Sequence, residues 1–223
     1  GPLEQFLNTA REKLNEFKAG ILPVIEFLSG VDDSVTIHKE HSARLKLDVR
    51  EVYFSPRLAT ERKRVMQSVE NGEKILDMFC GIGPFPIVIA RNKNVDITAV
   101  DINESAIKYL DENIRLNKLK GQIKTYCGDA RKASDEFKTK YDRIIMNLPG
   151  LAYTFLDVAV NLIEDNGIIN YYEFSNSYEQ GIKRITDAAN EVGKKVEIIN
   201  CRKVKSTSPG EWHVAIDAKI SEI

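Results

Sequence analysis

The sequence is poor in cysteine, proline and tryptophan, with three, seven and one of them in 223 residues. The cysteines, Cys80, Cys127 and Cys201, are odd in number and share no metal-ligand spacing. This pattern argues against a disulfide framework and against a zinc site. We therefore predict reduced thiols and no bound metal.

Long hydrophobic runs are also missing. No apolar stretch reaches the ~20 residues that a bilayer-spanning helix needs, and the N-terminus lacks the basic-then-apolar order of a secretory signal. We therefore predict a cytoplasmic protein with no membrane partner, and nothing in the sequence indicates a protein partner. Residues 1–3, Gly-Pro-Leu, match the scar of a cleavage protease, which predicts a natural chain that begins further upstream.

Charge of neither sign dominates. The net charge is −1 and the pI is near 6.4, whereas nucleic-acid-binding domains often have a pI above ~9. Basic residues nevertheless crowd two segments, residues 57–64 and residues 202–205. These segments predict either a local basic face or ordinary solvated charge.

The remaining composition, 43% hydrophobic and 29% charged, is typical of a globular α/β protein. We predict a small α+β domain over residues 1–54 and a larger domain over residues 55–223 that opens with a linking helix over 55–70. In the small domain, apolar spacing predicts a helix over 3–18 and strands over 21–28, 35–38 and 43–48.

Strands and helices alternate from residue 73 onward. Alternation of this kind builds a mostly parallel sheet with helices on both faces. The predicted strands cover 73–77, 96–101, 123–127, 141–146, 167–174, 195–202 and 212–219, the last two antiparallel. The predicted helices cover 85–90, 106–117, 152–163 and 178–192.

The most informative segment is Asp77-Met-Phe-Cys-Gly-Ile-Gly-Pro-Phe85, between a strand and a helix. Gly81 and Gly83 carry no Cβ, so the backbone can turn sharply and approach a ligand closely. Asp101 ends the next strand, where a ribose hydroxyl needs an acceptor. A lone Gly-x-Gly also occurs in ordinary turns, and a nicotinamide dinucleotide site has a third glycine where this chain has Pro86. The context favours an adenosyl ligand, which we infer to be S-adenosylmethionine, and hence methyl transfer.

Four strands of the predicted sheet end in Phe79, Asp101, Asp129 and Asn147. Because ligands of open parallel sheets bind beyond the carboxyl ends of the strands, these residues should line one crevice, although each alone could be a cap or turn residue. Asp101 is the predicted ribose ligand, and Asp129 and Ala130 should lie beside the adenine. Apolar walls should come from Phe79 and Ile102, and Asp77, Gly81 and Gly83 complete the predicted donor site.

Asn147-Leu-Pro-Gly150 follows its strand where base-modifying N-methyltransferases often carry Asn-Pro-Pro-Tyr. The Asn147 amide offers a donor and an acceptor to a planar nitrogenous substrate, and Pro149 stiffens the loop. A simple turn after a strand is the alternative.

Several segments together resemble the archaeal and eukaryotic type of tRNA guanine N1-methyltransferase, which modifies guanosine 37 beside the anticodon. They are Thr36–Glu40, Val52–Arg62, Asp77–Phe85, Ala99–Asn103, Met146–Pro149 and Ser208–Val214. The resemblance covers most of the chain and implies a class I S-adenosylmethionine-dependent methyltransferase domain, Rossmann-like, behind a small α/β domain. The family's further N-terminal domain, which grips the tRNA elbow, has no counterpart in these residues.

The resemblance also implies roles for single residues. Glu61 is the predicted general base that takes the N1 proton of guanine. Arg62 is predicted to contact the methyl donor, and Arg57 is predicted to stabilise negative charge on the guanine oxygen. Asn147 would orient the base, with Pro149 beside it, and Tyr53 would stack on the nucleotide.

Other interpretations stay open at this point. Glu61 could be an exposed carboxylate in the first turns of a helix. Some family members methylate C7 of a tricyclic wyosine precursor at position 37, and the chain could do so too. A non-catalytic tRNA-binding module is the third possibility.

Overall fold

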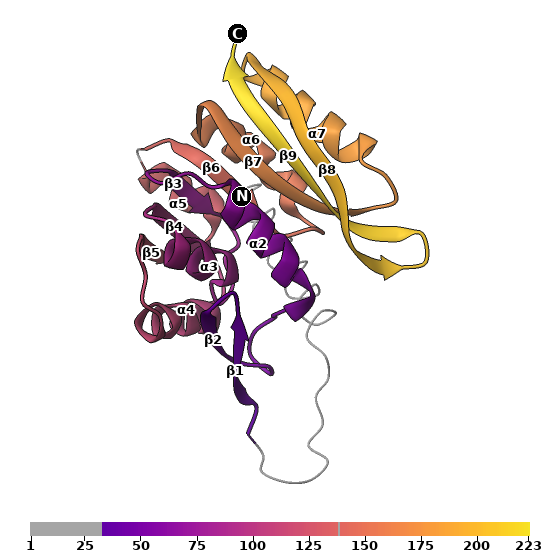
Figure 1. Ribbon diagram of the computed structural model, residues 1–223. Helices are drawn as coiled ribbons and strands as arrows, with labels where there is room; N and C mark the ends of the chain where they lie inside the picture. Colours follow the sequence, from indigo (N-terminus) through magenta and orange to yellow (C-terminus); the bar gives the residue numbers. More distant parts are fainter. Residues whose placement is uncertain (1–32, 138) are drawn as a thin grey trace, which may run out of the picture.

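The structure, a computed structural model, describes residues 33–137 and 139–223. The helix predicted over 3–18 and the strand predicted over 21–28 lie outside the described residues. What is described forms a seven-stranded sheet and a separate two-stranded sheet (Figure 1).

The large sheet has the strand order β5-β4-β3-β6-β7-β9-β8. Its bounds are β3 Lys74–Asp77, β4 Asp96–Asp101, β5 Gln122–Cys127, β6 Tyr141–Met146, β7 Ile163–Ser175, β8 Lys194–Ser208 and β9 Glu211–Glu222. The first five strands in this order pair in parallel, and β9 pairs antiparallel with β7 and β8. The fold class predicted from the sequence is confirmed, including the antiparallel closing strands. The carboxyl ends of β5, β4, β3 and β6 are consecutive along one edge.

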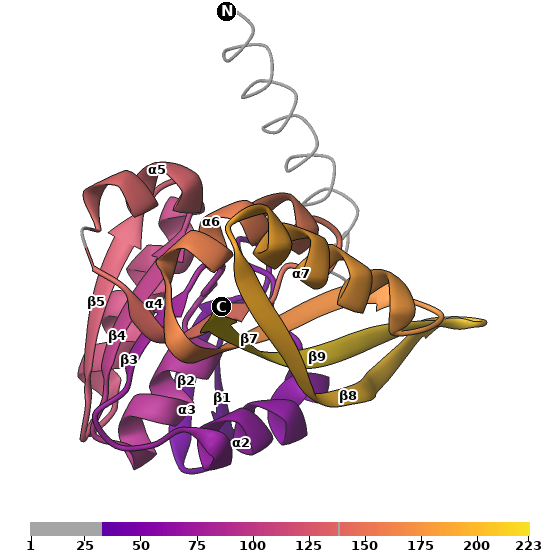
Figure 2. The ribbon, with the colours of Figure 1, turned by 90° about the horizontal axis from the view of Figure 1, so that it is seen from above.

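Helices cover both faces of this sheet (Figure 2). Helices α2 (Ala59–Ser68), α3 (Pro84–Asn92) and α4 (Glu104–Leu116) pack on one face, and α5 (Ala130–Glu136), α6 (Leu156–Leu162) and α7 (Glu179–Glu191) pack on the other. Each layer is closed by apolar side chains, such as Phe85 and Ile89 of α3 against Ile75 and Ile145 of the sheet. No helix of the described residues is long and apolar enough to span a membrane.

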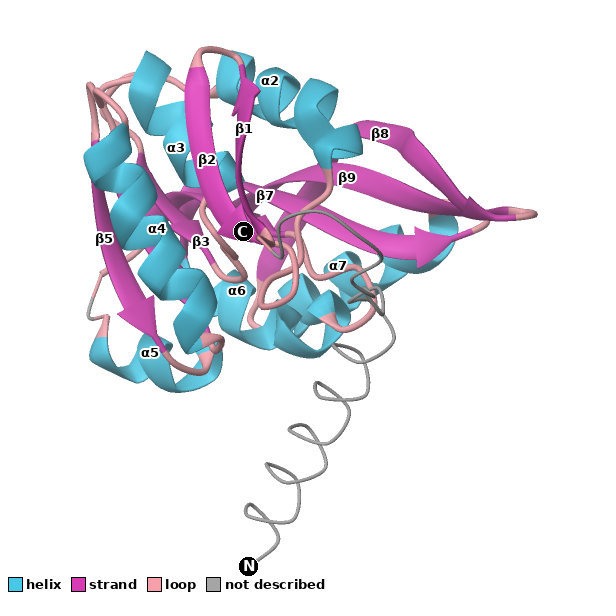
Figure 3. Cartoon of the chain, turned by 90° about the horizontal axis from the view of Figure 1, so that it is seen from below, coloured by secondary structure: helices cyan, strands magenta, loops and turns pink. Residues whose placement is uncertain are grey.

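The two-stranded sheet is a hairpin of β1 (Val35–Glu40) and β2 (Ala43–Asp48) that lies over the helices of one face (Figure 3). Leu45 and Leu47 share an apolar cluster with Leu110 of α4. The buried amide of Asn113, also on α4, accepts from Lys46 N at 2.7 Å and donates to Lys46 O at 3.1 Å. The hairpin is therefore held on α4 by hydrogen bonds from a side chain to its backbone, as well as by apolar contacts.

The structure departs from the predicted elements in a few places. Helix α5 was missed, because its short, mostly polar sequence has no apolar periodicity, and the Asp129 cap that starts it was assigned to the ligand. The linking helix predicted over 55–70 begins as a 3-10 turn, η1 (Pro56–Leu58), and the helix predicted over 152–163 is a 3-10 turn, η2 (Ala152–Phe155), followed by α6. Strands β7, β8 and β9 are longer than predicted, since backbone pairing extends beyond their apolar stretches.

Candidate active site

The glycine loop between β3 and α3 shows why both glycines are present. Gly83 has φ +86°, and a Cβ there would lie 2.2 Å from Cδ1 of Leu110. Gly81 has φ +54°, but a Cβ there would meet nothing within 4 Å. Gly83 is thus required by the packing of the protein itself, whereas Gly81 borders open space in which a ligand can approach the backbone.

Asp101 fixes this loop from the end of the neighbouring strand β4. Its Oδ2 accepts from Gly81 N and its Oδ1 accepts from Asn103 N, each at 2.8 Å. The next side chain, Ile102, is 39% exposed. The structure therefore brings Asp101, Ile102 and Gly81 together at the end of β4.

Asp77 is the last residue of β3, directly before the glycine loop, and only 1% of its surface is exposed. Its Oδ1 accepts from Phe79 N at 3.2 Å. Burial, together with the charge of nearby Asp101, raises the pKa of Asp77 to about 8. Without a cation beside it, this carboxyl keeps its proton at neutral pH, and a bound ammonium group would favour its ionised form.

The predicted walls of the crevice come from the neighbouring strand ends. Phe79 is half-buried and contacts the ring of Phe155 edge to face, with 5.0 Å between centroids. Asp129 caps α5 by accepting from Arg131 N at 2.8 Å, and Ala130 is buried. One oxygen of Asp129 is thus used by the cap, and its place beside an adenine stays a prediction.

Asn147 and Pro149 follow β6 along the same edge. The Oδ1 atom of Asn147 is buried and has no hydrogen-bond partner among the described residues. The carbonyl of Pro149 accepts from Phe174 N at 3.2 Å, which ties this loop to the end of β7. A buried acceptor without a donor is costly and indicates a position that a ligand or a water completes.

Glu61 is buried, with 1% of its surface exposed, so the alternative of an exposed carboxylate is wrong. Its Oε1 accepts from Arg64 Nη2 at 2.7 Å and from the Tyr172 hydroxyl at 2.9 Å. Nε of Arg202 lies 3.1 Å from its Oε2. Two guanidiniums therefore balance the charge of the predicted base.

The arginines of residues 57–64 have different environments. Arg62 is buried, donates from Nη2 to Glu40 at 2.6 Å, and lies against the ring of Phe54. Arg64 donates to Asp217 at 2.6 Å as well as to Glu61. A basic face that includes Arg62 and Arg64 is therefore wrong, because internal carboxylates neutralise both. The predicted contact between Arg62 and the methyl donor stays a prediction.

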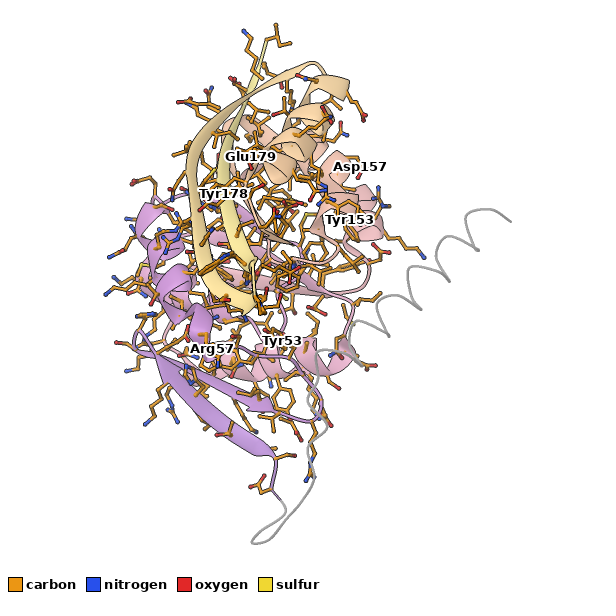
Figure 4. The ribbon with its side chains drawn as sticks, turned by 90° about the vertical axis from the view of Figure 1, so that its right-hand side faces the viewer. Tyr53, Arg57, Tyr153, Asp157, Tyr178 and Glu179 are labelled. Carbon is orange, nitrogen blue, oxygen red and sulfur yellow. The ribbon has the colours of Figure 1, made fainter. Side chains whose placement is uncertain are left out.

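Arg57 and Tyr53 differ from these arginines because they face solvent. Arg57 is exposed on η1, and Tyr53 is 50% exposed. Figure 4 labels both below the tip of the β8–β9 hairpin. Their positions leave them accessible to a substrate.

His213 belongs to the same neighbourhood and was not assigned a role from the sequence. It is 2% exposed, and neither ring nitrogen has a partner among the described residues. Its ring contacts Tyr172 and Phe174 edge to face, with centroids 5.5 and 5.6 Å away. Burial, and then the charge of Lys205, lower the pKa of His213 to about 4, so the ring is neutral. His213 lies in the segment Ser208–Val214, which belongs to the resemblance, but the sequence of this segment does not predict which residues His213 contacts.

A glycine loop, an acid at the end of the next strand and an open loop backbone fit an adenosyl donor. No group of three His, Cys, Asp or Glu residues in the described part of the chain could hold a metal ion. The fold and the residues gathered at these strand ends define a class I methyltransferase of the Rossmann type.

The chain belongs to the TRM5/TYW2 methyltransferase domain family, whose model matches residues 36–199. It is 45% identical over 197 residues to the tRNA (guanine(37)-N(1))-methyltransferase Trm5b of Pyrococcus abyssi, which covers 87% of this chain and 58% of the relative. The crystal structure of that Trm5b superposes with a TM-score of 0.80, covering 86% of this chain and 58% of that one.

The other branch of the family is also represented. A tRNA(Phe) (4-demethylwyosine(37)-C(7)) aminocarboxypropyltransferase of Methanocaldococcus jannaschii is 37% identical over 205 residues, 90% of this chain and 81% of the relative. The crystal structure of M. jannaschii TYW2 in complex with AdoMet is 35% identical, with a TM-score of 0.80, and covers 89% of this chain and 90% of that one. Of the Trm5b relative, by contrast, the chain spans 58% of the length.

Proposed function

We propose that this chain transfers the methyl group of S-adenosylmethionine to N1 of guanosine 37 in tRNA, work that belongs to the cytoplasm. The observation that carries the proposal is the buried, unpartnered Oδ1 of Asn147 at the edge of the sheet where the glycine loop lies. An acceptor in this position suits a planar base that presents N–H groups.

The donor site uses residues of the three strands beside Asn147. Asp101 would accept from the ribose hydroxyls, Ile102, Phe79 and Ala130 would contact the adenine, and the open backbone at Gly81 would lie along the donor. Bound there, S-adenosylmethionine supplies a methyl group activated by its sulfonium. The raised pKa of Asp77 leaves a group that can ionise when the ammonium of the donor arrives.

The substrate side favours guanine over adenine. The Watson–Crick edge of guanine presents two donors, N1–H and the exocyclic amino group, whereas that of adenine presents one donor and one acceptor. Asn147 Oδ1 and the Glu61 carboxylate are two acceptors. With adenine, one of these two acceptors would face the lone pair of adenine N1. Two acceptors that face each other cost more binding free energy than a missing contact.

Glu61 then acts as the general base. Its carboxylate takes the N1 proton, the N1 electron pair attacks the methyl carbon, and the electrons of the carbon–sulfur bond go to sulfur. Proton acceptance of this kind contributes roughly 10²–10⁴-fold. Oε2 must exchange its ion pair with Arg202 for the N1–H of guanine, while Arg64 and Tyr172 keep the carboxylate in place. Arg57 would balance charge on the guanine oxygen, and Tyr53 would stack on the nucleotide.

The test is incubation of the chain with labelled S-adenosylmethionine and unmodified tRNA that carries guanosine 37, beside an adenosine 37 variant, followed by nucleoside analysis. We expect N1-methylguanosine from the first tRNA alone. Equal labelling of both tRNAs, or label at another position, would overturn the proposal.

A second candidate function is transfer to C7 of the 4-demethylwyosine precursor at position 37. This second function is supported by the aminocarboxypropyltransferase relative, because the match to this chain covers 81% of that relative's length. The group transferred could be methyl or aminocarboxypropyl, and the mass of the modified nucleoside distinguishes the two. A tRNA that carries the precursor is the substrate for this test.

We also infer the domain division from the sequence, residues 1–54 and 55–223. The separate two-stranded sheet of β1 and β2 supports it. The shared core with α4 implies that the two parts contact each other closely.

A further inference from the structure

We propose that the tip of the β8–β9 hairpin, together with the segment before α2, is a docking surface for the RNA strand beside the modified nucleotide. This hairpin surface consists of Lys203, Lys205 and Trp212 and of Tyr53 and Arg57, which also contact the target guanosine in the proposed function. This inference rests on the proposed function, because it assumes that the crevice receives a nucleotide of an RNA.

The register of the sheet places the hairpin tip beside the crevice. Ser175, at the carboxyl end of β7, pairs with Trp212, and Lys205 pairs with His213. Because β7 is parallel to β6, this end of β7 lies at the edge that carries Asn147. A strand leaving the crevice therefore meets the hairpin tip.

The cations of the hairpin surface lie at or near the surface of the protein. Arg57 and Lys203 are exposed and Lys205 is half-buried. In the described part of the chain, no carboxylate forms an ion pair with any of the three. Glu211, the acid on the hairpin turn, accepts from the hydroxyls of Thr207 and Ser208. Arg62, Arg64 and Arg202, in contrast, all pair with carboxylates.

Aromatic rings accompany these cations. Nζ of Lys205 lies 3.5 Å from the hydroxyl of half-exposed Tyr53. Nζ of Lys203 lies 4.7 Å from the ring centroid of Trp212. Paired residues of antiparallel strands point to the same side, so Lys205 and His213 lie on one face of the hairpin and Trp212 lies on the other with Ser175. Lys205 thus lies beside the ring of Tyr53 on one face of the hairpin, and Lys203 lies beside the ring of Trp212 on the other.

This arrangement fits an RNA strand better than another partner. Cations neutralise the phosphates, and rings stack on bases that have left a helix. A polyanion also explains why three cations that form no ion pair with the described residues gather near these strand ends, in a chain whose net charge is −1. The occupant we propose is the loop strand on one side of the target guanosine.

The experiment measures binding of a synthetic RNA stem-loop with guanosine at the proposed position, over a range of salt concentrations. Loss of one phosphate contact should lower the slope of log affinity against log salt by about 0.7 to 0.9. We expect K203A and K205A each to lower the slope by this amount and to weaken binding several-fold at moderate salt. K195A is the matched control, because Lys195 is an exposed lysine at the opposite end of β8, and it should leave the slope unchanged.

The rings are tested separately with W212L in the same assay, since leucine keeps an apolar side chain but cannot stack. We expect several-fold weaker binding with an unchanged salt slope. The proposal is overturned if K203A and K205A behave like K195A, or if an acidic peptide of equal charge binds as tightly as the RNA.

Binding needs no methyl transfer, so a failed methylation assay with intact slopes would overturn only the proposed reaction. Affinity for S-adenosylmethionine, expected to be unchanged in all variants, shows that each is folded.

Discussion

At the residue scale, the environment of Glu61 is the feature that bears most directly on chemistry. Arg64 of α2 and Tyr172 of β7 donate hydrogen bonds to this carboxylate, and Arg202 of β8 forms an ion pair with it. Such contacts fix the position of the carboxylate before a substrate arrives. They also imply that Glu61 cannot be replaced without disturbing buried charge.

Replacing Glu61 with Gln should slow methyl transfer by ~10² or more, because an amide cannot accept the N1 proton. Affinity for S-adenosylmethionine should change little. E73Q is the control. Glu73 also pairs with a buried arginine, Arg143, at 2.8 Å, but it lies at the end of β3 that is remote from the glycine loop. Single-turnover rates and donor affinities of both variants provide the measurement. A normal rate in E61Q would exclude its role as base.

Asp77 predicts a pH dependence of stability. The pKa of its carboxyl is raised from 3.8 to about 8 in the folded protein, so between these values the folded state holds a proton that the unfolded state has released. This contribution to stability is present below about pH 4 and is lost as the pH rises toward about 8, at no more than ~1.4 kcal/mol per pH unit. In D77N that loss should disappear. Urea unfolding at pH 5 and pH 8 tests it, and an unchanged difference between the two pH values would contradict it.

His213 has the opposite dependence. Its pKa falls from 6.5 to about 4 on folding, so the unfolded state binds the proton first. Stability is therefore complete above about pH 6.5 and is lost as the pH falls toward about 4. H213F keeps an aromatic ring against Tyr172 and Phe174 and should remove this acid-side loss. Urea midpoints of the wild-type protein and of H213F at pH 4.5 and pH 7 provide the measurement. An equal loss of stability at pH 4.5 in both proteins would refute the prediction.

At the element scale, the glycine loop separates what the fold needs from what a ligand needs. Leu110 leaves no room for a side chain at position 83, whereas Gly81 and Gly72 both have positive φ and open space where a Cβ would lie. Only Gly81 lies at the crevice. The pair therefore offers a test in which the backbone cost is matched.

We expect G81A and G72A each to lose about 1 to 2 kcal/mol of stability from the left-handed backbone. G81A should in addition weaken S-adenosylmethionine binding at least tenfold, because its methyl group would occupy the space in which we propose that the donor lies. Calorimetric titration of the donor provides the measurement. Equal affinities in the two variants would show that the ligand does not approach Gly81.

The elements that the sequence predicts best are those with a local signal. The apolar stretches of β4 and β6 match their predicted bounds, and the glycines and Asp101 mark the loop without further knowledge. The contacts of Arg64 could not be predicted, because its partner Asp217 lies 153 residues away. Arg62 and Glu40 are likewise joined only by folding. Local charge alone therefore predicted a broader basic face than the structure has.

At the scale of the whole molecule, the β1–β2 hairpin and the large sheet are coupled through Asn113. Its Nδ2 donates to Lys46 O in the hairpin and to Ile82 O in the glycine loop, each at 3.1 Å. The side chain is completely buried. We therefore expect a movement of the hairpin to alter the loop that we propose binds the donor.

N113A should destabilise the protein by about 2 to 4 kcal/mol, since it leaves buried backbone groups without partners. It should also speed amide hydrogen exchange in both the hairpin and the glycine loop. N117A is the control, because Asn117 bonds to Arg44 in the hairpin at 2.8 and 2.9 Å but is only half-buried and, within the described residues, does not bond to the loop. If amide hydrogen exchange in N113A became faster in the hairpin but not in the glycine loop, the proposed coupling would be contradicted.

The interior position of β9 has a consequence for synthesis of the protein. Residues 211–222 lie between β7 and β8 in the sheet, so neither neighbour can complete its hydrogen bonds until these residues have left the ribosome. Asp217, which holds Arg64 against Glu61, arrives with them. Up to that moment β7 and β8 have unpaired edges, which are prone to association with other chains. During synthesis the glycine loop therefore emerges well before Asp217, the residue that holds Arg64 beside the base that we propose, Glu61.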